Sequence, residues 1–173
     1  MENISFIIVQ LIGIIAWVLL VISYYKKDVN EILSIHIIAG CLYVFHYYFL
    51  DAYSGAIICL FEVLRDYGYY KTDLDRYIYI GSIPIYAILG FINFKSITSL
   101  LPVCSGLIDG YVLTKNKKIV VMGATVSYIF WVIYNYSVKS YSGVITEGIL
   151  VLSNLSILIF NKGLFQNKDI RKK

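Results

Sequence analysis

Three side chains able to recognise a small molecule lie close together in the segment WVIYNYSVKSYSGVITEG, residues 131–148. Trp131 offers an aromatic face and Asn135 offers an amide. Glu147 offers a carboxylate that can bind a cationic or polyhydroxylated group or carry a proton. The alternative for Glu147 is a structural role, in which it is bonded to Asn135, to a hydroxyl or to the backbone.

The composition indicates that these residues belong to a membrane protein. Hydrophobic residues make up 59% of the 173 residues and charged residues only 15%, and the mean hydropathy is +0.73. A helix needs roughly 17–25 apolar residues to cross a bilayer. Almost no chain is then left for a soluble domain.

Seven apolar segments separated by polar residues predict an all-α protein with seven transmembrane helices. The prolines Pro84 and Pro102 fall inside two of them, where hinges and static kinks are equally expected. The segments are 4–25, 32–50, 54–70, 77–94, 97–114, 119–138 and 142–160.

The distribution of Lys and Arg sets the orientation, because these residues accumulate on the cytoplasmic side. With the N-terminus outside, the odd-numbered connections and the C-terminal tail hold 13 of the 15 basic residues, Arg65 among them. The opposite side holds Lys95 and Lys139. The sequence therefore predicts an N-out, C-in protein whose basic segments contact anionic lipid rather than nucleic acid.

An internal repeat relates the two halves of the chain. A shift of 88 positions superimposes the Tyr-Ser-Gly triplets at residues 53–55 and 141–143, as well as Val44 on Val132 and Tyr48 on Tyr136. We expect a single transmembrane domain over 1–173. Its parts are a first triple-helix repeat (4–70), a connector helix (77–94), a second parallel repeat (97–160) and a basic cytoplasmic tail (161–173).

Hairpin geometry predicts where the polar side chains meet. Trp131 and Glu147 are equally far from Lys139, so each lies about 12 Å below that turn. The same construction around Asp51 places Tyr43 beside Cys59 in the first repeat. A two-fold relation between the repeats would bring all four into one pocket.

Further polar residues share the faces of this pocket. His46 and Asn135 lie one turn nearer the outside, and Asp66 and Asn154 lie about ten ångströms nearer the cytoplasm. For His46, lining the pocket and hydrogen-bonded packing remain equal alternatives. Glu62 and Arg65 are spaced as an ion pair on one helix.

The chain resembles two groups of membrane proteins. The segments WVIYN and SYSGVITE are similar to the second-repeat hairpin of the SWEET and SemiSWEET sugar facilitators. Together with ISYYKK, HYYFLDAYSGA and Arg65, they resemble more closely the YgjV family of small bacterial inner-membrane proteins. The resemblance implies a multi-pass protein of the bacterial inner (plasma) membrane, with two triple-helix bundles joined by a fourth helix as in the SWEET and PnuC transporters. It also implies that Trp131 is a stacking platform and that Glu147 takes the place of a substrate-binding amide.

We expect a transporter or facilitator that moves a small polar molecule by alternating access through a pocket between the repeats. Catalytic motifs of intramembrane enzymes are missing from the sequence, so no enzymatic reaction, cofactor or metal is expected. The alternative is a non-transporting membrane receptor or interaction protein on the same scaffold. The substrate, direction, coupling ion and oligomeric state, homo-oligomers included, stay open.

Overall fold

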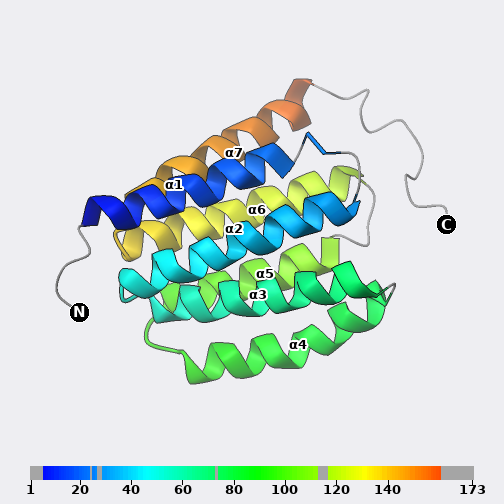
Figure 1. Ribbon diagram of the computed structural model, residues 1–173, viewed down its shortest axis with the longest axis horizontal. Helices are drawn as coiled ribbons and strands as arrows, with labels where there is room; N and C mark the ends of the chain where they lie inside the picture. The colour runs from blue at the N-terminus through cyan, green and yellow to red at the C-terminus, as the bar shows by residue number, and fades with distance from the viewer. Residues whose placement is uncertain (1–5, 24, 27–28, 73, 113–116, 161–173) are drawn as a thin grey trace.

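The computed structural model describes residues 6–23, 25–26, 29–72, 74–112 and 117–160, and all their regular structure is helical. Seven α-helices and one short 3-10 helix follow one another along the chain (Figure 1). The elements are α1 (Phe6–Ser23), α2 (Val29–Phe49), α3 (Tyr53–Lys71), α4 (Asp75–Ile92), η1 (Ile97–Leu100), α5 (Leu101–Val112), α6 (Lys117–Ser137) and α7 (Tyr141–Phe160).

The seven expected segments correspond to the seven α-helices, although the fifth is divided. The expectation of one continuous helix over 97–114 is wrong, because η1 precedes the α-helix that begins at Leu101. Pro102 therefore lies in the first turn of α5, where a missing N–H breaks no intrahelical bond. Pro84 does lie inside α4. The expected basic tail, residues 161–173, lies outside the described residues.

Within the described ranges, four helices are long and apolar enough to cross a membrane, as judged by length and composition. They are α1, α2, α6 and α7, and α4 and α5 are shorter apolar helices. The sequence of α3 differs from these because it contains Glu62, Arg65 and Asp66 in addition to its terminal lysine. Charged side chains on such a helix need partners from neighbouring helices.

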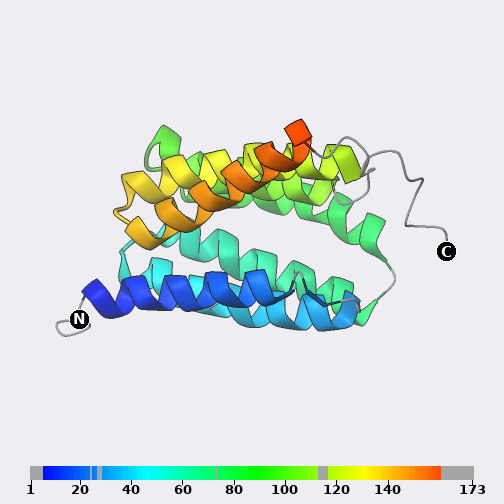
Figure 2. The same cartoon turned by 90° about the horizontal axis from the view of Figure 1, so that it is seen from above.

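The helices form two layers. In Figure 2, α1–α3 lie on one side, and α5–α7 lie on the other side together with α4. Within the layers α2 packs between α1 and α3, and α6 packs between α5 and α7. The layers meet where α1 contacts α7 and α3 contacts α5, and α4 contacts both α3 and α5.

The turns between α2 and α3 and between α6 and α7 have the same backbone geometry. Their residues Asp51 and Lys139, 88 positions apart, have positive φ angles of 56° and 59°. Each turn is also closed by an equivalent bond, Ala52 N to Tyr47 O and Ser140 N to Asn135 O, both 2.9 Å. We call the end of the molecule that carries these two turns the hairpin end.

Close packing in the second hairpin depends on Gly143. A Cβ atom at this position would lie 2.5 Å from Cγ of Asn135. We therefore expect Gly143→Ala to lower the free energy of unfolding in detergent by about 1–3 kcal/mol, the usual cost of overpacking.

Gly148→Ala on the same helix is the matched control, because no atom lies within 4 Å of the added Cβ. This control should keep the wild-type stability or gain up to about 1 kcal/mol of helix propensity. Equal stabilities of the two variants would contradict the packing seen at Gly143.

Candidate functional site

Tyr47 connects the two layers at the centre of the candidate site. Its hydroxyl donates a hydrogen bond of 2.8 Å to Oδ1 of Asn135 on α6. Its ring stacks on Trp131, with centroids 5.5 Å apart and planes 20° from parallel. Tyr43 also stacks on Tyr47, with centroids 6.2 Å apart. An aromatic column thus runs across the layers from α2 to α6.

The carboxyl group of Glu147 lies next to this column. Glu147 is 9% exposed, and its Oε2 atom has no hydrogen-bond partner. It interacts electrostatically with Tyr47 and with the thiol of Cys59. The Nδ2 atom of Asn135, a fully buried residue, also lacks a partner. One donor and one acceptor are therefore buried here without partners.

The four residues expected at one depth do come together. Trp131 and Cys59 belong to one buried cluster, and Tyr43 packs against that cluster. Glu147 joins them through its electrostatic interaction with Cys59. The arrangement can hold a small molecule only if the aromatic column opens, because Tyr47 covers one face of Trp131.

Two alternatives were expected for His46, and the structure shows hydrogen-bonded packing. Its Nδ1 donates to the carbonyl oxygen of Val9 at 2.7 Å, and its Nε2 lies 2.7 Å from Oγ of Ser140. A carbonyl only accepts, so Nδ1 carries a proton and Nε2 of the neutral ring accepts from the serine. His46 thereby joins α1 and α2 to the second hairpin.

Other polar contacts join the layers at the hairpin end. The hydroxyl of Tyr134 accepts from the Gly55 N–H at 2.7 Å and donates to the Ala52 carbonyl at 3.2 Å. Oε1 of Gln10 accepts from both the N–H and the hydroxyl of Ser142 at 2.8 Å. The first turn of α3 and the start of α7 are each held by a side chain of the other layer.

A second polar cluster lies farther from the hairpin end and is built around Arg65. The guanidinium, 8% exposed, forms an ion pair with Asp66 at 3.2 Å. It also donates to the hydroxyl of Tyr86 on α4 at 3.0 Å and to the Gly106 carbonyl on α5 at 3.5 Å. The expected ion pair between Glu62 and Arg65 is wrong, because the carboxylate within ion-pair distance is that of Asp66.

The burial of Arg65 also corrects the count of basic residues expected in the cytoplasmic connections. Arg65 lies inside the helical bundle and does not belong to a connection. Asp66, expected to line the pocket, is half-buried and is the ion-pair partner of Arg65. Asn154, on α7, is half-buried as well.

Two carboxyl groups link the Arg65 cluster to Glu147. Glu62 and Asp109 each interact electrostatically with Arg65 and with Glu147. Asp109 also accepts a hydrogen bond of 2.8 Å from Ser127. Polar groups therefore continue from Asn135 inward to Arg65 along the contact between the layers.

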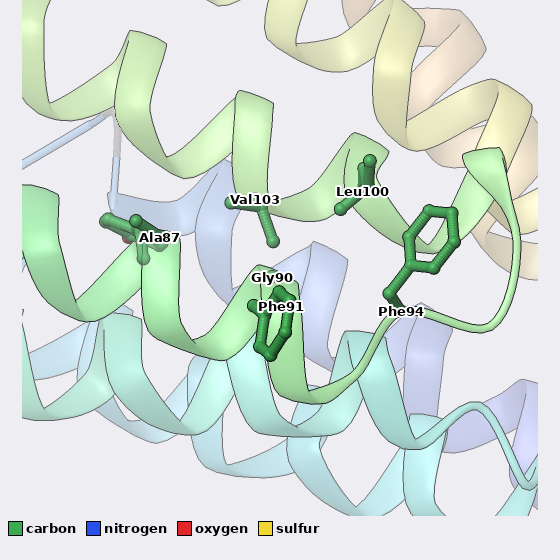
Figure 3. Close-up of a pocket in the computed structure, with 7 residues that line it drawn as sticks. Ala87, Gly90, Phe91, Phe94, Leu100 and Val103 are labelled. Carbon is green, nitrogen blue, oxygen red and sulfur yellow. The ribbon is translucent and has the colours of Figure 1, made fainter.

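A groove lies elsewhere, between α4 and the segment formed by η1 and α5 (Figure 3). It has a volume of about 580 Å³ and contains none of the eight residues expected at the site. Apart from the Tyr86 hydroxyl its lining is apolar, which suits contact with lipid. It is lined by Tyr86, Ala87, Gly90, Phe91, Phe94, Leu100 and Val103.

The sequence analysis missed Tyr47 and Tyr86, two residues that organise the interior. A signal for Tyr47 was present, because it lies 88 positions before Asn135, the same shift that separates the two Tyr-Ser-Gly triplets. Tyr86 had no comparable signal: it lies on the connector helix, and the chain contains 17 tyrosines.

The apolar helices and the buried polar interior define a multi-pass helical membrane protein. The chain belongs to the Imp-YgjV family of bacterial inner membrane proteins, whose model matches residues 7–161. The expected resemblance to this family and the location in the inner membrane are thus confirmed. No curated protein and no solved structure matches the chain significantly.

The stability of the interior should depend on Arg65. We expect Arg65→Met to lower the free energy of unfolding by about 3–5 kcal/mol, because it removes a buried guanidinium and leaves the half-buried carboxylate of Asp66 without its cation. Adding Asp66→Asn to Arg65→Met should recover part of that loss. Denaturant titration in detergent measures both effects.

Arg76→Gln serves as the control, since Arg76 is exposed at the start of α4. It should change stability by no more than about 0.5 kcal/mol. An Arg65→Met protein as stable as this control would show that the cluster is not needed for folding.

Proposed function

We propose that this inner-membrane protein moves a small polar molecule across the membrane by alternating access. The observation that carries the proposal is the pair of buried, unpartnered polar atoms, Oε2 of Glu147 and Nδ2 of Asn135, at the contact between the layers. Unpaired polar atoms are costly inside a protein, and a ligand that pairs with them would remove that cost. Translocation without covalent chemistry is the activity proposed.

The proposed machinery is a pair of parallel triple-helix repeats, α1–α3 and α5–α7, joined by α4. The matching turns at Asp51 and Lys139 support it. So does the packing, because α1 contacts α7 just as α5 contacts α3. A bond between repeat counterparts, from Tyr47 to Asn135, lies where a two-fold axis between the repeats would pass.

We place the hairpin end outside and the C-terminus in the cytoplasm, with seven membrane crossings. Lys95 and Lys139 are the basic residues of the hairpin end. The connections at the opposite end hold Lys26, Lys71 and Arg76 among others, which agrees with the excess of basic residues in cytoplasmic loops.

In this proposal the structure has its outer side closed. The contacts from Tyr47, Tyr134 and Gln10 to the other layer lie within about three helical turns of the hairpin end. Nearer the cytoplasm, the longer bond from Arg65 to Gly106 joins the layers. Opening the outer side would separate Tyr47 from Trp131 and expose both rings to a substrate.

The residues would then have distinct roles. Trp131 and Tyr43 would stack on the substrate, Asn135 would donate a hydrogen bond, and Glu147 would bind a polar or charged group. Cys59 would line the same space. His46 would hold the outer hairpins together, and Asp66 and Asn154 would lie along the route to the cytoplasm.

Transport should depend on Glu147. We propose a thermal-stability screen of the purified protein against sugars, nucleosides, vitamins and amines, followed by flux measurements in liposomes with each hit. Glu147→Gln and Glu147→Ala should reduce flux at least about 10-fold, because each removes a charge-assisted bond. Trp131→Ala should abolish the stabilising hit.

Glu31→Gln is the matched control, since Glu31 is exposed and pairs with Lys26 near the start of α2. It should transport as wild type. Unchanged flux in both Glu147 variants would refute the role of this residue. A ligand that binds and responds to Trp131→Ala but never crosses the liposome membrane would favour the receptor alternative.

A further inference from the structure

The described interior contains more acidic than basic side chains. In the described part of the chain, one carboxyl group is buried and three linked to Arg65 or Glu147 by electrostatic interactions are half-buried, whereas a single guanidinium, that of Arg65, is buried. The carboxyl groups belong to Glu62, Asp66, Asp109 and Glu147. Positive charge from outside the chain is needed to balance such a set in a membrane.

Arg65 does not compensate Glu147. Its ion pair is with Asp66, and its remaining described bonds go to Tyr86 and Gly106. The charged groups with which Glu147 interacts electrostatically, Glu62 on α3 and Asp109 on α5, are both acidic. Glu147 is thus the buried carboxylate with an unpartnered oxygen and only like charges beside it.

Tyr47, with which Glu147 interacts electrostatically, belongs to an aromatic cluster. Trp131 meets Tyr47 face to face at 5.5 Å and Tyr134 edge to face at 5.7 Å. Aromatic faces attract ammonium groups, and they do so most strongly where water is excluded. A carboxylate beside such faces is a combination that recognises an organic cation.

Asn135 places a second and independent requirement on the ligand. Its Oδ1 accepts from Tyr47, whereas its Nδ2 is fully buried and has no acceptor. Its side chain packs on Gly143, one helical turn from Glu147 on α7. The ligand should therefore carry a hydrogen-bond acceptor a few atoms away from its positive charge.

We propose that the substrate of this site is a small organic ammonium ion that also carries a hydroxyl or carbonyl oxygen. The ammonium group pairs with Glu147 against the rings of Trp131 and Tyr47, and the oxygen accepts from Nδ2 of Asn135. This inference rests on the proposed transport function for its route to the site. Protonation alone would neutralise Glu147 but would leave Nδ2 of Asn135 without an acceptor.

Choline and ethanolamine are suitable probes for the full-length protein in detergent. Each is compared with an uncharged analogue: choline with the molecule in which carbon replaces nitrogen, and ethanolamine with ethylene glycol. We expect the cations to raise the melting temperature and to give saturable binding by calorimetry, and the uncharged analogues to give neither. Glu147→Gln should weaken cation binding about 10- to 100-fold, while Glu31→Gln should not.

Comparing each cation with its uncharged analogue uses wild-type protein, so it does not depend on the folding of a variant. Three results would overturn the inference: equal binding of a cation and its analogue, wild-type affinity in a folded Glu147→Gln protein, or no binding of either cation up to millimolar concentration. In the last case, pH-dependent proton uptake that Glu147→Gln removes would identify a proton as the compensating charge.

The inference and the proposed transport function fail in different ways. Cation binding without flux in liposomes would keep the cation site and remove the transport function. Flux of an uncharged polar solute that neither cation inhibits would keep transport and remove the cation site.

Discussion

A polar group inside a membrane has little water to bond with, so its partners must come from other helices. This constraint explains how the two layers are joined. Tyr134 bonds to the first turn of α3, and His46 connects α1 with the second hairpin. Arg65 satisfies Asp66 and Tyr86. The helices are positioned by these bonds as well as by apolar packing, and Gly143 lets α7 approach the side chain of Asn135.

Two buried polar atoms of the described residues lack such partners, and the proposed function rests on them. Oε2 of Glu147 and Nδ2 of Asn135 lie beside the same tyrosine, Tyr47, which itself spans the layers. The bond that closes the layers therefore uses one end of the Asn135 amide and leaves the other end for a ligand. A movement that breaks the Tyr47–Asn135 bond would therefore separate the two layers and change the proposed binding site at the same time.

The positions of the helices and the two matching turns could be predicted, because hydropathy and the triplets 88 positions apart can be read directly from the sequence. Apolar segments locate the helices, and the equivalent turns follow from the repeated triplet. Helix spacing also predicted that four side chains lie at one depth, those of Trp131, Glu147, Tyr43 and Cys59. The choice of partner for Arg65 could not be predicted, since Glu62 and Asp66 are both close in sequence and side-chain conformation decides between them. The bond from Arg65 to Tyr86 on α4 could not be predicted either, because α4 has no counterpart 88 positions away in the sequence comparison.

Distances between spin labels test alternating access most directly. Phe45 and Ile133, 88 positions apart, are exposed near the hairpin end, where the proposal places the outside of the membrane. Tyr67 and Leu155, also 88 positions apart, are exposed farther from that end and form the inner pair. With Cys41 and Cys104 replaced, one pair at a time is labelled and measured with and without a transported ligand. The account predicts opposite changes: as the outer pair separates, the inner pair approaches. Distances that stay constant for both pairs, or that change in the same direction, would contradict it.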